Sequence, residues 1–243
     1  MKAIVTGHTR GLGAAVAREL LVRGVSVMGL ARGKCATLRT DFPELFTQYE
    51  IDLGDSTALA YWVASGVLEE FFEGSSLVLL VNNAGTVQPI GPLHEQDPLT
   101  VGRAVALNVA APLMLSAAVV AAAPLAARRV LHVSSGAGSS TYPGWSVYGA
   151  TKAALDHHAR AAALDDVPGV RVCSLAPGVI DTAMQAELRE TPVAHFPSRQ
   201  RFIDMERNGQ LSTPQACAIR LVEYLLSARF GAVAVEDLRA VAQ

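Results

Sequence analysis

Short apolar runs alternate with helically spaced apolar residues along almost the whole chain. Residues 2–6 form a β-branched run, a glycine-rich turn follows, and apolar residues then recur at helical spacing as far as Gly24. The unbroken apolar run at 77–82 is typical of a strand buried on both faces. The pattern predicts strands at 2–6, 25–30, 49–52, 77–82, 130–134 and 170–175, with a last strand at 231–235. It predicts further helices at 99–127, 148–165 and 213–227.

This alternation of strands and helices predicts an α/β fold. Right-handed crossovers place helices on both sides of a parallel sheet, so we expect one domain over residues 1–243, a Rossmann-type doubly wound parallel sheet. Ligands bind such a sheet at the carboxyl ends of its strands, near the switch in strand order. Residues 191–209 are rich in proline, arginine and polar residues and lack periodicity. We therefore expect a mobile substrate lid at about 181–210.

Charge and cysteine usage exclude several classes of function. With 20 Lys and Arg against 22 Asp and Glu, the net charge of −2 leaves no basic surplus for nucleic acid or an anionic membrane. The three cysteines form no CxxC pair and the six histidines form no metal-binding motif, so we expect a reducing, cytoplasmic compartment and no metal.

The apolar run at the N-terminus is too short for an export signal. The apolar segment 104–127 is interrupted by Asn108 and two prolines, which favours a buried interface helix over a membrane span.

The turn after the first predicted strand reads TGHTRGLG, residues 6–13. Its glycines allow the backbone to turn tightly and to approach a pyrophosphate, while the following helix supplies free N–H groups and a positive dipole. Glycine spacing alone also fits a plain tight turn. The strand-turn-helix context favours a dinucleotide site.

The residue after the second predicted strand bears on the choice of cofactor. An NAD-dependent enzyme usually offers a carboxylate there to the ribose 2′-hydroxyl, whereas this chain has Ala31 and Arg32. Arg32 and Arg10 together favour a 2′-phosphate, because guanidinium groups match phosphate oxygens. The alternative is that both arginines are solvated surface residues. The predicted cofactor is NADP(H).

Two further segments belong to the same end of the sheet. Asp52 is expected to accept a hydrogen bond from an adenine amino group; alternatively, it caps the helix that begins at Ser56. The segment NNAG at 82–85 ends the fourth predicted strand. Its amide side chains can join neighbouring loops, and its small residues leave room for a flat ring.

The candidate chemistry lies in the second half of the chain. Tyr148 and Lys152 are four residues apart in a predicted helix, hence on one face and about 6 Å apart along the axis. A phenol has a pKa of about 10, and a lysine cation beside it stabilises the phenolate, which would make Tyr148 a usable acid. Ser134 and Ser135 end the preceding strand, where a hydroxyl can donate to a substrate carbonyl or simply cap a loop.

In their order and spacing, these motifs resemble the compact branch of the short-chain dehydrogenase/reductase family over nearly the whole chain. The matching positions are TGHTRGLG, NNAG, Asn108, Ser135, Tyr148 with Lys152, and Pro177-Gly178. The resemblance implies that Tyr148 is the general acid, that Ser135 rather than Ser134 polarises the carbonyl, and that Asn108 anchors a proton-relay water. It also implies that Lys152 lowers the pKa of the tyrosine and holds nicotinamide ribose hydroxyls. The expected cofactor contacts are Gly7, Thr9, Arg10, Gly11, Leu12, Gly13, Arg32, Asp52, Leu53, Asn83, Ala84, Gly85, Tyr148, Lys152, Pro177, Gly178, Val179 and Thr182.

Several longer segments resemble the benzil reductase and sepiapterin reductase-like subgroup, which implies a carbonyl flanked by a second carbonyl or an aromatic ring. Apolar residues are concentrated in the loops that follow the strands, and these fit a substrate pocket as well as ordinary packing of loops on the core. The expected substrate contacts are Ser135, Tyr142, Trp145 and Met184. We therefore expect an NADPH-dependent reductase of apolar or aromatic ketones or diketones.

Two other functions remain open from the sequence. One is a 3-oxoacyl-thioester reductase, for which Arg189, Arg199, Arg201 and Arg207 would contact an acidic carrier protein. The other is a non-catalytic NADP sensor, which need not keep Asn108, Ser135 and the Tyr-Lys pair together.

The small residues at 101–127 and 148–165 predict a homodimer or homotetramer. The C-terminal segment lacks the double glycine of many relatives, which leaves the tetramer contact open.

Overall fold

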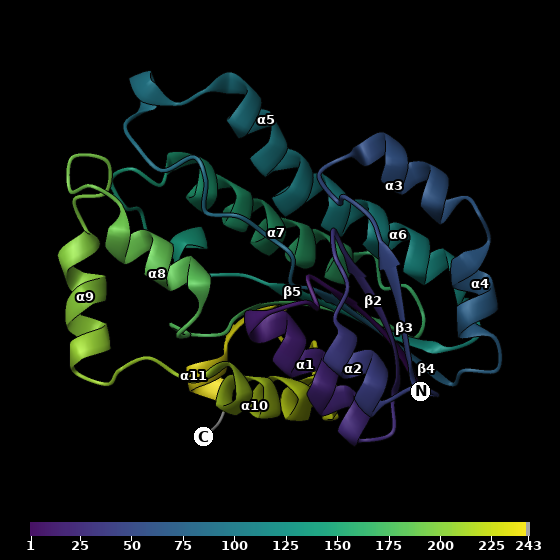
Figure 1. The fold of residues 1–243 in the computed structure, drawn as a ribbon. Helices are drawn as coiled ribbons and strands as arrows, with labels where there is room; N and C mark the ends of the chain where they lie inside the picture. Colours follow the sequence, from purple (N-terminus) through teal and green to yellow (C-terminus); the bar gives the residue numbers. More distant parts are fainter. Residues whose placement is uncertain (242–243) are drawn as a thin grey trace.

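Seven parallel strands form one sheet in the computed structural model, which describes residues 1–241 (Figure 1). The strands are β1 (Lys2–Thr6), β2 (Ser26–Ala31), β3 (Phe46–Glu50), β4 (Leu77–Asn82), β5 (Ala127–Val133), β6 (Val170–Ala176) and β7 (Val235–Asp237). Their order is β3-β2-β1-β4-β5-β6-β7, and every pair is parallel. The chain runs outward in one direction from β1 and in the other from β4. The predicted doubly wound α/β fold is confirmed.

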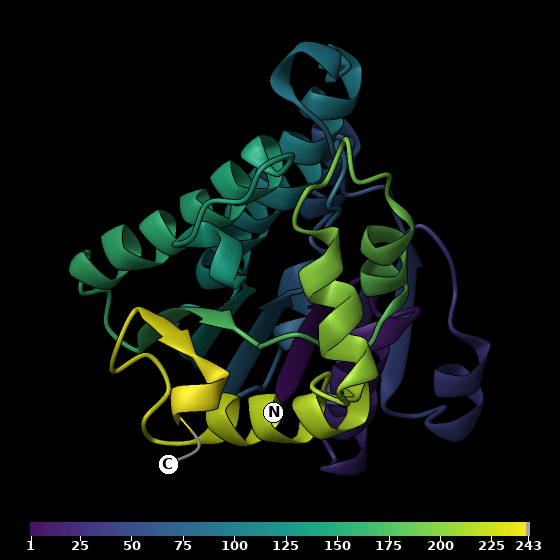
Figure 2. The same ribbon diagram turned by 90° about the vertical axis from the view of Figure 1, so that its left-hand side faces the viewer.

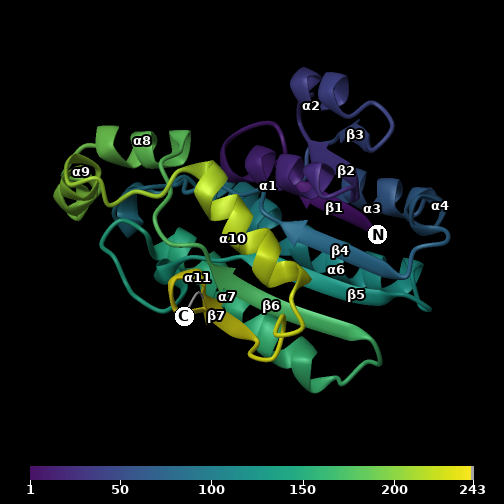
Figure 3. The same ribbon diagram turned by 90° about the horizontal axis from the view of Figure 1, so that it is seen from below.

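Helices cover both faces of this sheet. On one face, α1 (Gly11–Val22) packs along α10 (Pro214–Leu226), as the view from below shows (Figure 3). The other face carries α3 (Ser56–Val63), α4 (Val67–Phe72), α6 (Ala111–Ala122) and α7 (Ser146–Leu164). Each face has its own cluster of buried apolar residues. The remaining helices are α2 (Ala36–Asp41), α5 (Pro98–Val105), α8 (Ala183–Glu190), α9 (Arg199–Arg207) and α11 (Leu238–Val241).

Side-chain caps fix where several helices begin. Asp55 accepts hydrogen bonds from the backbone N–H groups of Thr57 and Ala58 and so starts α3. The alternative assignment of this cap to Asp52 is therefore wrong. The Asp52 carboxylate instead accepts from the N–H of Gly54 at 2.9 Å, within the turn that follows β3.

The predicted helix at 99–127 is interrupted and ends early. A π-helical turn, Ala106–Ala110, joins α5 to α6. Pro112 has no N–H, so the carbonyl of Asn108 loses its partner one turn ahead, which accounts for the distortion. Pro124 follows the end of α6, and Ala127 already belongs to β5. The Pro98–Ala122 segment is long and apolar enough to cross a membrane by length and composition, but α6 packs on β4, β5, α3 and α4.

Other boundaries also differ from the sequence prediction, among them the start of β5 at Ala127 instead of residue 130. The third strand lies at Phe46–Glu50 instead of 49–52, because buried Phe46 pairs with Val27 of β2. The last strand is Val235–Asp237 instead of 231–235, since Gly231 is in a turn with φ of 72°. The segment described as lacking periodicity contains α9 and is preceded by α8. These two helices lie beyond the carboxyl edge of the sheet, to the left of the strands in Figure 1 and in front of them in Figure 2.

Candidate active site

A cleft of about 1370 Å³ crosses the carboxyl edge of the sheet. The turns after β1, β2 and β4 line one end of it, and α7, the end of β5 and the α8–α9 segment line the other. It thus lies over the position where the strand order reverses, between β1 and β4. All of the expected cofactor and substrate residues line this cleft. Of the four expected catalytic residues, Ser135, Tyr148 and Lys152 line the cleft, whereas Asn108 does not.

The glycine-rich turn forms a tight cradle at one end of the cleft. Gly7 and Gly11 have positive φ values of 70° and 56°, which favour glycine. A Cβ on Gly13 would lie 2.2 Å from the carbonyl oxygen of Gly7, so no larger residue fits there. The Thr6 hydroxyl accepts hydrogen bonds of 2.9 Å from the N–H groups of Asn83 and Ala84. The turn after β1 is thereby joined to the NNAG segment after β4.

A side chain of β3 joins this turn to the loop that carries Arg32. The Gln48 amide oxygen lies 2.8 Å from the backbone nitrogen of Cys35 and 3.0 Å from Nε2 of His8. Because the Cys35 N–H can only donate, the amide atom must be the oxygen, and His8 must carry its proton on Nε2. Burial lowers the pKa of His8, which is consistent with this neutral tautomer. Sequence reasoning missed Gln48, which no motif marks.

Arg10 and Arg32 are exposed at the same end of the cleft. Within residues 1–241 neither guanidinium group makes a hydrogen bond or an ion pair with a protein side chain. Lys34, two residues after Arg32, pairs with Glu50 at 2.9 Å. Both arginines are therefore available to an anionic ligand, and Asp52 and Leu53 line the cleft beside them.

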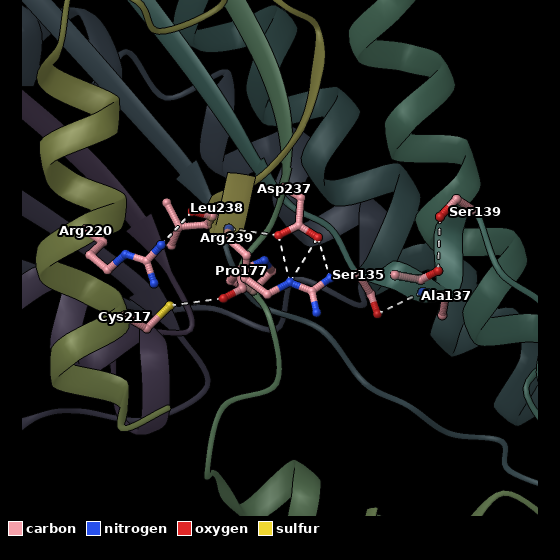
Figure 4. A network of polar contacts seen from close by, with 10 residues as sticks. Ser135, Ala137, Ser139, Pro177, Cys217, Arg220, Asp237, Leu238 and Arg239 are labelled. Atoms are coloured by element: carbon pink, nitrogen blue, oxygen red, sulfur yellow. Dashed lines mark hydrogen bonds and ion pairs between the residues drawn. The ribbon is translucent and has the colours of Figure 1, made fainter. Parts of the chain in front are cut away.

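The Pro177-Gly178 turn lines the cleft on the β6 side. Figure 4 shows Pro177 between Cys217 and the pair formed by Asp237 and Arg239. The Cys217 thiol donates to the carbonyl of Pro177 at 3.6 Å, and Gly178 has a φ of 87°. Arg239 of α11 pairs with Asp237 of β7 through several contacts, including 2.9 Å from Nε to Oδ1. A Cβ on Gly178 would lie 3.6 Å from the Arg239 side chain, so this ion pair packs directly against the turn.

Tyr148 and Lys152 lie on one buried face of α7, and they face each other. The ammonium nitrogen of Lys152 is 5.7 Å from the centroid of the Tyr148 ring. It donates a 2.7 Å hydrogen bond to the carbonyl of Val133, at the end of β5. The side chains are 7% and 6% exposed, so both polar groups sit against the cleft with little access to bulk water. Tyr148 and Lys152 therefore lie side by side on α7, as their spacing in the sequence predicts.

The electrostatics of this pair differ from the simple expectation. Burial raises the pKa of Tyr148, and the hydrogen bond with the Ser135 hydroxyl acts in the opposite direction. Burial lowers the pKa of Lys152 to about 8, while the Asp156 carboxylate opposes this shift. Lys152 therefore remains mostly protonated at neutral pH. The lowered tyrosine pKa that the resemblance implies is not present in the protein alone.

The two adjacent serines have different surroundings. The Ser134 hydroxyl is buried and donates to Oδ1 of Asp156 at 2.7 Å. Ser135 is partly exposed to the cleft, where its hydroxyl accepts from the N–H of Ala137 at 3.1 Å and lies near enough to Tyr148 to lower the pKa of that phenol. Only Ser135 is therefore placed beside the candidate acid. Asp156 was not expected from the sequence, although its position two turns after Tyr148 on the same face offered a signal.

Asn108 sits in the π-helical turn behind the pair. Its Nδ2 donates to the carbonyl of Thr86 at 2.8 Å and to the Thr151 hydroxyl at 3.1 Å, and its Oδ1 accepts from the N–H of Thr86 at 2.9 Å. A Cβ on Gly85 would lie 3.2 Å from Oδ1. The side chain thus connects Thr86, the residue after the NNAG segment, to α7.

Aromatic rings form the wall of the cleft opposite the glycine-rich turn. The Trp145 ring centroid lies 5.0 Å from that of Tyr148, 4.8 Å from that of Phe196 and 5.4 Å from that of Tyr142. Met184 packs against this cluster from α8. Trp145, Tyr142 and Met184 all line the cleft, whereas Phe196 is buried behind Trp145.

Among residues 1–241 no group of three His, Cys, Asp or Glu side chains is arranged to hold a metal ion.

Comparisons with known proteins identify the family. The sequence profile of the short chain dehydrogenase family matches residues 1–193. The chain is 32% identical to benzil reductase ((S)-benzoin forming) from Bacillus cereus, covering 88% of this chain and 90% of that protein. It is 31% identical to sepiapterin reductase from Bos taurus, covering 93% and 90%. The chain belongs to the short-chain dehydrogenase/reductase family, as its motifs indicated.

Solved structures agree with this assignment. A short-chain dehydrogenase/reductase from Burkholderia vietnamiensis is 49% identical, with a TM-score of 0.72 over 98% of this chain and 96% of that chain. The KRED1-Pglu enzyme is 26% identical, with a TM-score of 0.85 over 97% and 99%. The protein is therefore an oxidoreductase that acts on a small molecule with a nicotinamide cofactor, and its curated relatives support a carbonyl reductase.

Proposed function

We propose that the protein is an NADPH-dependent carbonyl reductase of apolar or aromatic ketones or diketones. The observation that carries this proposal is the joint placement of Tyr148, Lys152 and Ser135 beside an aromatic wall. A non-catalytic NADP sensor would have no need of a buried ammonium group beside a buried phenol, because burying such groups is costly.

The residues at the other end of the cleft fit a dinucleotide. Gly7, Gly11 and Gly13 form a cradle that any Cβ on Gly13 would fill, and the start of α1 presents free N–H groups to a pyrophosphate. Arg10 and Arg32 would bind a 2′-phosphate, which favours NADP(H) over NAD(H). Asp52, Leu53 and the NNAG segment would flank the adenine and nicotinamide ends. When bound, the reduced cofactor would supply hydride to the carbonyl carbon.

The side chains of this protein perform the remaining tasks. Ser135 donates a hydrogen bond to the substrate carbonyl oxygen, which becomes more negative during reduction. Tyr148 donates its phenolic proton to that oxygen as the alkoxide forms. The ammonium group of Lys152 stabilises the resulting phenolate, and Asn108 would anchor the water that returns a proton to Tyr148. The raised pKa of Tyr148 keeps it protonated and ready to act as an acid.

The arginines of the α8–α9 segment bear on the alternative substrate. Arg189 pairs with Glu206 at 2.9 Å, and Arg199 donates to the carbonyl of Arg189 at 2.6 Å, so both hold the segment together. Arg207 does not line the cleft, and Arg201 donates to the Tyr142 hydroxyl at 3.2 Å. Arg189 and Arg199 are thus engaged within the segment, whereas Arg201 and Arg207 are exposed, so turnover of an acyl thioester is the result that would favour a 3-oxoacyl-thioester reductase.

A screen of NADPH oxidation tests the proposal. The purified protein is assayed with benzil, sepiapterin, a quinone and an acetoacetyl thioester at equal concentration, with NADH in parallel. We expect turnover of the diketone benzil and of the aromatic carbonyl compounds in the set, with NADPH preferred over NADH. Turnover of the thioester alone, or of none of the four, would refute the substrate assignment.

We also propose a single domain over residues 1–243, with the α8–α9 segment acting as a lid at about 181–210. Packing of Tyr142 and Trp145 against Phe196 and Phe202 supports the lid. A homodimer or homotetramer in the cytoplasm is the proposed form of the protein. Light scattering distinguishes these assemblies from a monomer.

A further inference from the structure

The buried face of α7 carries a third polar side chain beyond the catalytic pair. Tyr148, Lys152 and Asp156 recur at intervals of four residues and are 7%, 6% and 5% exposed. The first two face the cleft, whereas Asp156 does not line it. A carboxylate in such a place is costly unless other groups compensate its charge, so its presence calls for a physical reason.

Two hydroxyl groups from neighbouring strands bind the carboxylate. Ser134, which directly follows β5, donates to Oδ1 at 2.7 Å, and Ser174 of β6 donates to the same oxygen at 2.6 Å. A Cβ on Gly138 would lie 2.6 Å from Oδ2, so a glycine there leaves room for the carboxylate beneath the turn after β5. Asp156 therefore connects α7 with both strand ends and with the segment that begins at Ser135.

The same carboxylate acts on Lys152. The two residues lie one helical turn apart on the buried face of α7, and they bond to the adjacent residues Val133 and Ser134. Burial lowers the pKa of Lys152 to about 8, and the nearby Asp156 carboxylate opposes this shift. Apart from the carboxyl group of Glu236 on β7, the titratable groups around the two residues are neutral at pH 7. Burial raises the pKa of Tyr148 and raises that of Cys173 on β6 to about 11, while the pKa of His132 on β5 is about 3. Glu236 of β7 acts with Asp156 on Cys173.

We propose that Asp156 is a positioning residue that keeps the Lys152 side chain charged at the site and fixes it against the end of β5. Without this carboxylate, a lysine buried so completely would lose its proton near neutral pH. Its stabilising effect on the phenolate of Tyr148 would then be lost. The inference rests on the proposed reductase function, in which a charged Lys152 supports proton transfer from Tyr148.

The small number of lysines makes a direct measurement feasible. The chain contains only Lys2, Lys34 and Lys152, so protein labelled with ¹³C-lysine gives three side-chain signals, and Lys152→Met assigns the third. We expect Lys152 to titrate near pH 8 in the natural protein. Asp156→Asn should lower this midpoint by about one unit, and Asp156→Glu should restore most of the shift. An unchanged midpoint in Asp156→Asn overturns the inference.

The pH profile of reduction gives a second readout. In Asp156→Asn, kcat should decline at a pH about one unit lower than in the natural protein, with little change near pH 6, because Lys152 loses its proton earlier. Asp165→Asn makes the same chemical change at the exposed end of α7 and should leave the profile unchanged. A uniform loss of kcat at every pH would overturn the electrostatic role.

Two further controls keep the outcomes distinct. If Asp156→Asn does not fold, a triple variant with Asp156→Leu, Ser134→Ala and Ser174→Ala removes the carboxylate together with both of its donors and leaves no unpaired hydroxyl. The same lowered midpoint is expected there, and a midpoint near pH 8 overturns the inference. If the natural protein reduces no carbonyl compound, the proposed function fails, whereas the lysine titration still decides the role of Asp156.

Discussion

Lys152 holds its ammonium group inside the protein, and this burial should be measurable as a pH-dependent loss of stability. The pKa of Lys152 falls from its ordinary 10.5 to about 8 in the folded protein. One pKa unit corresponds to about 1.4 kcal/mol. The buried charge of Lys152 therefore destabilises the folded state by about 3 kcal/mol at any pH at which Lys152 is protonated in both the folded and the unfolded protein. That condition holds below about pH 8.

The sign of the pH dependence follows from the direction of this shift. Between pH 8 and 10.5 the unfolded chain binds a proton at Lys152 that the folded protein does not, so stability rises with pH in this window. Lys152→Met keeps a side chain of similar length but cannot titrate. Its stability relative to the natural protein should therefore decrease by about 2–3 kcal/mol between about pH 7 and about pH 10.

Urea denaturation of both proteins at a series of pH values measures this difference. Cys173 and Cys217 have pKa values raised to about 11, and they lower stability as pH rises above 9, but they do so in both proteins and cancel in the comparison. The unpaired carbonyl of Val133 in the variant adds a cost that does not depend on pH. A constant difference across the series would refute the buried-charge reasoning.

Three substitutions test other parts of the site. Ser135→Ala should reduce kcat by about 10²-fold or more, because it removes a donor to the developing oxyanion, whereas Ser134→Ala should cost much less; equal losses would contradict the assignment of Ser135. Arg32→Asp should weaken NADPH binding by about tenfold or more and spare NADH, as measured by fluorescence titration, and unchanged NADPH affinity would rule out the phosphate contact. Gln48→Leu should destabilise the protein by about 1–3 kcal/mol in urea, because the Cys35 N–H and His8 lose their shared acceptor; an unchanged midpoint would show that this connection is unimportant.

The fold was predictable because its signals are local and periodic. Apolar runs and glycine turns placed β1, β4 and α1 correctly, since each depends on residues adjacent in the chain. The errors in element bounds arose where contacts between residues distant in the chain determine where a strand or helix begins and ends. Pairing with β2 placed the third strand earlier than its polar sequence suggests, and the missing N–H of Pro112 converted a predicted helix into two segments joined by a π-helical turn.

The candidate site was predictable to the extent that motifs mark it. Tyr148 and Lys152 share a helix face by spacing alone, and the glycine turn follows its strand directly. Helical spacing placed Asp156 on the face of Tyr148, but its hydrogen-bond partners Ser134 and Ser174 lie 22 and 18 residues away in the chain and could not be predicted. Gln48 escaped altogether, because His8 lies 40 residues away and no motif marks the pair. The effect of burial on the pKa of Tyr148 was also missed, because exposure is a property of the folded protein.

The central claim is that the phenolic hydroxyl of Tyr148 protonates the reduced carbonyl oxygen. Replacement of this tyrosine by phenylalanine keeps the ring and its packing on Trp145 but removes the proton. With benzil as substrate, we expect Tyr148→Phe to oxidise NADPH about 10²–10⁴-fold more slowly than the natural protein, while it binds NADPH with nearly unchanged affinity. Turnover within a fewfold of the natural rate would contradict the account.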